Sequence, residues 1–218
     1  MKKIVTAAAL LLFSGVPLAQ ADDLAVGAKI GTLGLGAEVT TNVIPMMLNA
    51  RIQGNVFNYN STASINTLNG APVHYNQKMN LMTVGLLADF YPFAGKFRIT
   101  GGAYYNNNRA TLTSTTNATI NIGNTPVGPN TAITTKVKFK KLAPYVGIGW
   151  GDAVSSGSPL GFNFELGAVY QGSPKVSMFT SAQNVTPADL ALEAQHTQDQ
   201  LKKFKWWPVI SFGVSLKF

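Results

Sequence analysis

The end of the chain alternates strictly between apolar and small or polar side chains. From position 210 onward the apolar face carries Ile210, Phe212, Val214, Leu216 and Phe218, and the other face carries Ser211, Gly213, Ser215 and Lys217. Because a β-strand directs successive side chains to opposite faces, this segment has one apolar face and one narrow polar face. A strand of this kind suits a closed sheet with lipid outside and a narrow polar interior.

The same period of two recurs in eight segments, which form four hairpins. They cover about 24–32, 35–43, 47–58, 79–92, 97–106, 136–151, 160–171 and 206–218. The connections after the third, fifth and seventh segments are long and polar, whereas those after the second, fourth and sixth are short. Outer-membrane barrels have long extracellular loops and short periplasmic turns. The sequence therefore predicts an all-β fold, an eight-stranded antiparallel transmembrane β-barrel.

Alternation alone does not say which face points inward, because a soluble lipocalin-like barrel has the same period. Here the less apolar face consists largely of Gly, Ser, Asn and Thr, and only 12% of all residues are charged, about half the usual share. Aromatic residues form two rims, as at membrane interfaces. One rim holds Phe90, Tyr91, Phe93, Phe97, Trp150, Phe162 and Phe218; the other holds Tyr105, Tyr170, Trp206 and Trp207. We predict that the apolar face meets lipid.

The N-terminus has the features of a secretory signal peptide. Lys2 and Lys3 precede an apolar run over 4–13, and Ala19-Gln20-Ala21 matches a cleavage site. We expect a signal peptide at 1–21 and a barrel domain at 22–218, exported to the outer membrane of a Gram-negative bacterium. No other apolar run approaches the length of a transmembrane helix, and the chain has no cysteine for disulfides or thiolate metal sites.

Several motifs resemble those of a family of small proteobacterial outer-membrane β-barrels. They are the segments 26–38, 141–151 and 171–176, and the Lys205-Trp206-Trp207-Pro208 run before the last strand. The broader relatives would be the OmpA-like and opacity-protein eight-stranded barrels. The resemblance implies an outer-membrane location and a barrel fold, and no defined activity. The alternating C-terminal residues Phe212, Val214, Leu216 and Phe218 also resemble the signal that the barrel-assembly machinery reads.

Charged residues on the polar face are few and balanced. They are Lys29, Glu38, Arg51, Asp89, Arg98 and Glu165. Since side chains just fill the interior of an eight-stranded barrel, these six should meet inside it. A salt-bridged plug is the first interpretation, and a gated polar path is the alternative.

Two features lie outside the expected barrel wall. Thr186-Pro187 should begin a short helix in the last extracellular loop, with Thr186 as N-cap. Lys136, Lys138 and Lys140 alternate above the sixth apolar stretch and could contact lipopolysaccharide phosphates, or could simply be solvated. The net charge of +8 favours acidic lipid headgroups as partners, and an exported chain is not expected to bind nucleic acid.

The sequence gives little support to catalysis. His74 and His196 both lie in predicted loops, and neither has an obvious serine and carboxylate partner. We expect a monomer without cofactor or metal that has a structural or surface-interaction role. A narrow channel for small solutes is the alternative, and a lipid-modifying barrel enzyme is a more distant one.

Overall fold

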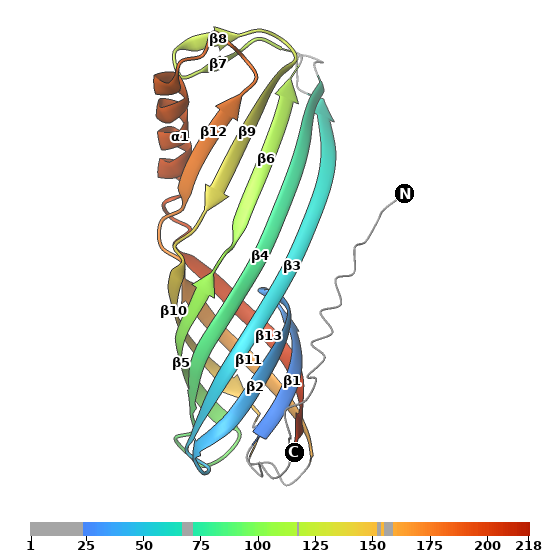
Figure 1. Cartoon of the computed structure of the whole chain (residues 1–218), viewed down its shortest axis with the longest axis vertical. Helices are drawn as coiled ribbons and strands as arrows, with labels where there is room; N and C mark the ends of the chain where they lie inside the picture. The colour runs from blue at the N-terminus through green and yellow to red at the C-terminus, as the bar shows by residue number, and fades with distance from the viewer. Residues whose placement is uncertain (1–23, 67–71, 117, 152–153, 155–158) are drawn as a thin grey trace, which may run out of the picture.

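The computed structural model describes residues 24–66, 72–116, 118–151, 154 and 159–218 (Figure 1). The predicted signal peptide lies outside these residues. Eight strands form a ring: β1 (Leu24–Gly31), β2 (Gly34–Ile44), β3 (Leu48–Asn66), β4 (Pro72–Phe90), β5 (Phe97–Asn106), β10 (Leu142–Trp150), β11 (Leu160–Tyr170) and β13 (Trp206–Lys217). The all-β class predicted from the sequence is confirmed.

Antiparallel pairing closes the ring without a free edge. Each strand pairs with the next ring strand, and the last, β13, pairs with both β11 and β1. At the seam Ile30 lies opposite Phe212, and the Phe218 amide donates to the Leu24 carbonyl at 2.9 Å. Closure satisfies the backbone groups that an open sheet would leave unpaired.

The apolar face points outward, as predicted. Leu86 and Phe162 are 65% and 69% exposed on the outer wall. Their chain neighbours Leu87 and Gly161 are buried on the inner face. An outer wall of exposed Ile, Leu, Val and Phe is unsuited to water and suited to hydrocarbon.

Aromatic residues gather at the end of the barrel with short turns. Phe97 packs against Phe93 and Trp150, with ring centroids 6.1 and 6.5 Å apart. The placement of Tyr91 in this outer rim was wrong: its side chain is buried on the inside. Tyr91 directly follows the outward Phe90, so the pleat turns it inward. On the opposite rim Trp207 is half-buried and packs against buried apolar side chains inside the barrel.

Two ring strands continue well past the barrel and carry a second sheet. β3 and β4 are each 19 residues long, and their far halves are extended by β6 (Arg109–Thr116), β9 (Thr131–Lys138) and β12 (Lys175–Thr180). The order β3-β4-β6-β9-β12 defines what we call the upper sheet (Figure 1). A short hairpin of β7 (Ile120–Ile122) and β8 (Thr125–Val127) lies at its tip.

Four sequence-based boundaries were therefore wrong. The segments 59–77 and 107–135, expected to be polar loops, contribute most of the upper sheet, and the last expected loop contributes β12. The expected sixth strand over 136–151 is two strands, because β9 pairs with β6 and β12 while β10 pairs with β5 and β11. Threonine has a high β-propensity, and backbone pairing does not require an apolar face.

The predicted helix is present as α1 (Pro187–Leu201), which lies along β12 (Figure 1). Thr186 caps it as expected: its hydroxyl accepts from the Asp189 amide, and the Asp189 carboxylate accepts from the Thr186 amide. The helix also covers the free edge of β12, where Gln198 Oε1 accepts from the Val176 amide at 3.3 Å. Among the described residues, no helix has the length and apolar character needed to cross a bilayer.

Asp189 also ties the β7–β8 hairpin to the helix. Its carboxylate accepts from the Thr125 hydroxyl at 3.0 Å and from the Asn124 amide at 3.3 Å. Hydrogen bonds from Thr186, Thr125 and Asn124 lower the pKa of Asp189 below its ordinary value. Since the pKa is lowered in the folded state, this stabilisation is present above the ordinary pKa and is lost as the pH falls through the lowered value.

We expect Asp189→Asn to loosen the hairpin and to reduce the hydrogen-exchange protection of the Asn124 and Thr125 amides. Protection in the unsubstituted chain should fall at acidic pH in the same two amides, after correction for intrinsic exchange rates. Glu193→Gln is the matched control on the same helix. Equal protection in the two variants would mean that the carboxylate of Asp189 does not hold the hairpin.

Glycines on the inner face make room for large side chains. A Cβ atom at Gly85 would lie 2.5 Å from Tyr104 Cε1, whereas a Cβ atom at Gly101 would meet nothing within 4 Å. Gly85→Val should destabilise the barrel by about 1–3 kcal/mol through overpacking, and Gly101→Val, on the outer wall, should be tolerated. Thermal unfolding in detergent micelles measures both, and equal melting temperatures would contradict this packing.

Candidate functional site

Six charged side chains from six different strands converge inside the barrel. They are Lys29 on β1, Glu38 on β2, Arg51 on β3, Asp89 on β4, Arg98 on β5 and Glu165 on β11. None is more than 5% exposed. Each is on the inner face because it alternates with outward apolar neighbours. The stagger of the strands then brings all six to one level, where they contact one another.

Arg51 contacts all three carboxylates of this layer. Its Nη1 lies 2.7 Å from Glu165 Oε2 and 3.1 Å from Glu38 Oε2. Its Nη2 donates to Asp89 Oδ1 at 3.1 Å, and its Nε lies 3.0 Å from Asp89 Oδ2 as an ion-pair contact. The planar guanidinium suits this role because it presents several donors in fixed directions.

Glu165 is the most heavily shared anion. Besides Arg51, its Oε2 lies 3.0 Å from Arg98 Nη2 and 3.5 Å from Lys29 Nζ. Its Oε1 accepts a hydrogen bond from the Tyr145 hydroxyl. The carboxylate is thus saturated by protein donors, which is the condition under which a buried charge is tolerated.

The layer is neutral overall, with three cations and three carboxylates. Lys29 lies 2.9 Å from Glu38, and Thr100 donates to Asp89 at 2.6 Å. Arg98 also donates to the Gly151 carbonyl at 2.8 Å, next to the short turn. We call these six side chains the charge layer.

A polar chain leads from the charge layer along the inner wall. Lys29 donates to Gln53, Gln53 to Asn55, and Asn55 to Thr83, each at 3.0 Å. These amide and hydroxyl groups satisfy one another, so the chain needs no ligand to be stable.

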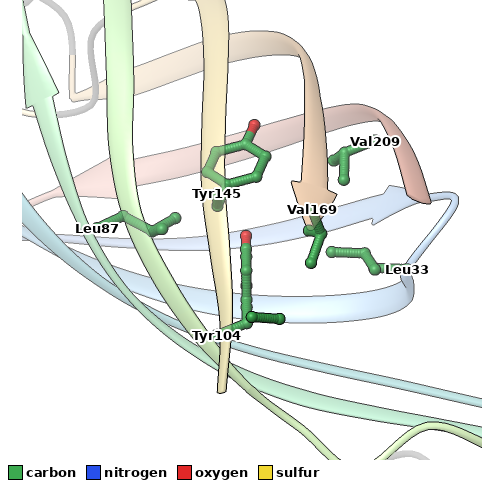
Figure 2. Close-up of a cluster of buried hydrophobic side chains, with 7 residues drawn as sticks. Leu33, Leu87, Tyr104, Tyr145, Val169 and Val209 are labelled. Atoms are coloured by element: carbon green, nitrogen blue, oxygen red, sulfur yellow. The ribbon is translucent and has the colours of Figure 1, made fainter. Parts of the chain in front are cut away.

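An apolar layer lies inside the barrel between the charge layer and the upper sheet. It consists of Leu33, Leu87, Tyr104, Ala143, Tyr145, Val169 and Val209, with Trp207 packed against it. Figure 2 shows the two tyrosine rings between Leu87 on one side and Leu33, Val169 and Val209 on the other. The rings meet edge to face, with centroids 5.5 Å apart.

Sequence reasoning missed this apolar layer. The inner face was expected to consist largely of Gly, Ser, Asn and Thr, whereas four inner side chains are Leu87, Val169, Val209 and Ala143. Each is next to an outward apolar residue in the sequence. Two adjacent apolar residues interrupt the alternation and place one apolar side chain on the inner face. These pairs could therefore have indicated the apolar layer from the sequence.

Little space is left among these side chains. The cavity bounded by Glu38, Thr40, Arg51, Asp89, Tyr91, Arg98 and Asn163 measures about 10 Å³. A cavity of that size is at the lower limit for one water molecule. The six side chains of the charge layer thus fill most of the space between them.

A larger pocket opens above the apolar layer, where the barrel meets the upper sheet. It measures about 490 Å³, and its lining is mostly apolar: Thr32, Val137, Phe139, Gln171, Pro174, Leu201, Phe204, Trp206, Trp207 and Pro208. Its floor includes Trp207, which also packs on the apolar layer. The pocket thus borders the apolar layer through Trp207.

The remaining predicted residues are dispersed. Lys136 and Lys138 are exposed on β9, but Lys140 lies in the β9–β10 connection with its methylene groups near Gly172. The aligned row of three lysines was therefore wrong, because the strand ends at Lys138. The C-terminal residues Phe212, Val214, Leu216 and Phe218 all face outward along β13.

His74 has one partner that the sequence did not suggest. Its Nδ1 lies 2.8 Å from the Ser64 hydroxyl, across the β3–β4 pair in the exposed upper sheet. The described residues supply this pair with no carboxylate, and they contain no group of three His, Cys, Asp or Glu side chains placed to hold a metal.

Solved structures share this fold, among them two from Acinetobacter baumannii. The crystal structure of Acinetobacter baumannii CarO2 matches with a TM-score of 0.61 and 23% identity, over 90% of this chain and 98% of that one. The crystal structure of CarO from the same organism gives 0.59 and 24%, with the same coverage. At these identities the similarity shows the fold alone. No protein-family model and no curated protein matches the chain.

Removing Arg51 should be the most damaging single change in the charge layer. Arg51→Met leaves Glu38, Asp89 and Glu165 short of a cation in a dry site, which costs about 3–5 kcal/mol. The exposed Arg109→Met, in the upper sheet, should cost far less. Urea unfolding in micelles gives both values; similar losses in the two variants would contradict the central role of Arg51.

Proposed function

We propose that this chain is an integral outer-membrane β-barrel protein with a closed interior and a structural or surface-interaction role. The outward apolar wall supports the location, since it would be costly in water. The aromatic rim at the short-turn end and the signal-peptide features of the N-terminus point the same way. The fold similarity to the CarO structures is consistent with this proposal.

The observation that carries the closed interior is the neutral charge layer around a cavity of about 10 Å³. A conducting lumen would need an aqueous gap at every level. Here the three cations contact the three carboxylates directly, and an apolar layer covers them on the side of the upper sheet. Two barriers in series favour a plug over a narrow channel for solutes.

An enzymatic role has less support. The Ser64–His74 pair is exposed to solvent and has no third group in the described part of the chain to orient it. General acid–base and nucleophilic catalysis both rely on such orientation. The upper sheet therefore serves better as an interaction surface, displayed outside the bilayer by the long strands β3 and β4.

The last strand suits a role in biogenesis. Phe212 and Phe218 are 59% and 53% exposed on the outer wall. We propose that these residues, with Val214 and Leu216, are read by the barrel-assembly machinery before β13 pairs with β1. After closure the same side chains would face lipid, and the barrel would function as a monomer.

The first test of the proposal is location. Cell fractionation should recover the folded chain with the outer membrane, and extraction should require detergent. Purified protein that stays folded and monodisperse in detergent-free buffer would contradict a lipid-facing wall.

The second test is conductance. Protein reconstituted into planar bilayers should give no stepwise currents, because the charge layer and the apolar layer would both block the lumen. A heat-dependent shift in gel mobility would establish that the same preparation is folded. Reproducible single-channel steps from that folded preparation would overturn the closed interior and favour the channel.

A further inference from the structure

One face of the upper sheet carries five exposed cations. Paired residues on neighbouring strands share a face, and the register places Arg109 of β6 opposite Lys138 of β9, and Lys138 opposite Lys175 of β12. In the adjacent row Lys78 of β4 and Lys136 of β9 lie on either side of one β6 residue. We call these five residues the basic face; all are exposed.

The basic face continues the lipid-facing wall of the barrel. On β4 the outward residues run Leu86, Val84, Met82, Asn80 and Lys78, because side chains on one face recur every second residue. Met82 and Val84 are among the last apolar residues of this wall. Asn80 pairs with Arg109, so the first cationic row lies one step of about 7 Å beyond Met82.

An outer-rim contact marks the end of the apolar wall on the neighbouring strand β5. Tyr105 pairs with Val84, is 53% exposed, and has the ammonium of Lys141 at 5.1 Å from its ring centre. Tyrosines of this kind lie where the apolar core of a bilayer meets its headgroups. Arg109 lies four residues beyond Tyr105 along the chain, so the basic face begins on the headgroup side of this boundary and looks sideways over the surrounding leaflet.

The row of Arg109, Lys138 and Lys175 is unfavourable by itself. Adjacent strands are about 4.8 Å apart, and like charges directly opposite one another destabilise a sheet. Among the described side chains, the carboxylates are either inside the barrel or on α1, and none forms an ion pair with these three cations. An anion from outside the chain would relieve the repulsion.

We propose that the basic face binds the phosphate groups of lipopolysaccharide in the leaflet around the barrel. This inference rests on the proposed outer-membrane location and adds the partner and its site. Arg109 can hold a phosphate through two parallel hydrogen bonds, and the lysines act as point charges. The sideways orientation favours a neighbouring lipid over a soluble partner that would approach from the tip of the sheet.

The site differs from the one that the sequence predicted. Lys136 and Lys138 belong to it, whereas Lys140 does not, because it lies beyond the end of β9. Lys78, Arg109 and Lys175 join it through strand pairing, although they are far from β9 in the sequence.

The test compares two triple variants of the full chain in non-ionic detergent, with purified lipopolysaccharide as the probe. The first removes the row: Arg109→Gln, Lys138→Gln and Lys175→Gln. The control removes the same charge beside the end of α1: Lys202→Gln, Lys203→Gln and Lys205→Gln. Heat-dependent gel mobility would establish that both variants fold, and titration would give each dissociation constant.

The unsubstituted chain should bind lipopolysaccharide, and the row variant should bind at least about tenfold more weakly. The control variant should bind as the unsubstituted chain does. Chemically dephosphorylated lipopolysaccharide should bind weakly to all three proteins, and added salt should weaken the phosphate-dependent binding.

Three results would overturn the proposal. Equal losses in the two triple variants would mean that net charge alone attracts the glycolipid. Undiminished binding of the dephosphorylated form would exclude phosphate recognition. Absence of binding by the unsubstituted chain would exclude the partner, while cell fractionation would show separately whether the outer-membrane location still holds.

Discussion

The structure depends on neutralising Arg51 inside a closed ring of strands. A guanidinium buried at 2% exposure is tolerated only where anions and hydrogen bonds replace water. Its three carboxylate partners come from β2, β4 and β11, so they reach it together only when the ring is closed. The charge layer thus links the electrostatics of the interior to the closure of the wall.

The same layer also fixes the register of the strands. Shifting a strand by one residue exchanges its inner and outer faces. For β3 this would move Arg51 into the lipid-facing wall and Ile52 into the charge layer. Placing an arginine on the lipid face costs about 2–4 kcal/mol near the bilayer centre. The three carboxylates left without Arg51 would add to that cost. Few alternative registers could compete with the observed one.

The sequence predicted the part of the fold that forms the wall of the barrel. There one environment is apolar and the other narrow and polar, and the alternation from Ile210 to Phe218 records both. The meeting of Lys29, Glu38 and Arg51 also followed from period and strand number. Their individual contacts could not be predicted from the sequence. Those contacts depend on the stagger of the strands and on the room left by glycines such as Gly85, and no local sequence pattern indicates either.

Beyond the barrel wall, alternation no longer separates an apolar face from a polar one, and there the sequence-based strand boundaries were wrong. The segment 109–116 is rich in threonine, and the side chains at 110–115 are all half-buried, so they form no strongly buried or strongly exposed face. The β9 strand was merged with β10 because Lys136, Lys138 and Lys140 continue the period of two across the three-residue break. Only strand pairing separates them, by assigning β9 to β6 and β12.

The outward residues of β4 nevertheless follow one pattern along both halves of the strand. The outward side of β4 is apolar from Phe90 to Met82 and then changes to Asn80 and Lys78. The inward side shows no such change, because apolar and polar residues are mixed along it, from Leu87 and Thr83 to Met79 and Gln77. The change is therefore confined to the outer side, where an apolar surface gives way to a polar and cationic one within a few residues. A wall that faces water along its whole length needs no such boundary, whereas a strand that leaves hydrocarbon for a charged headgroup region would require one.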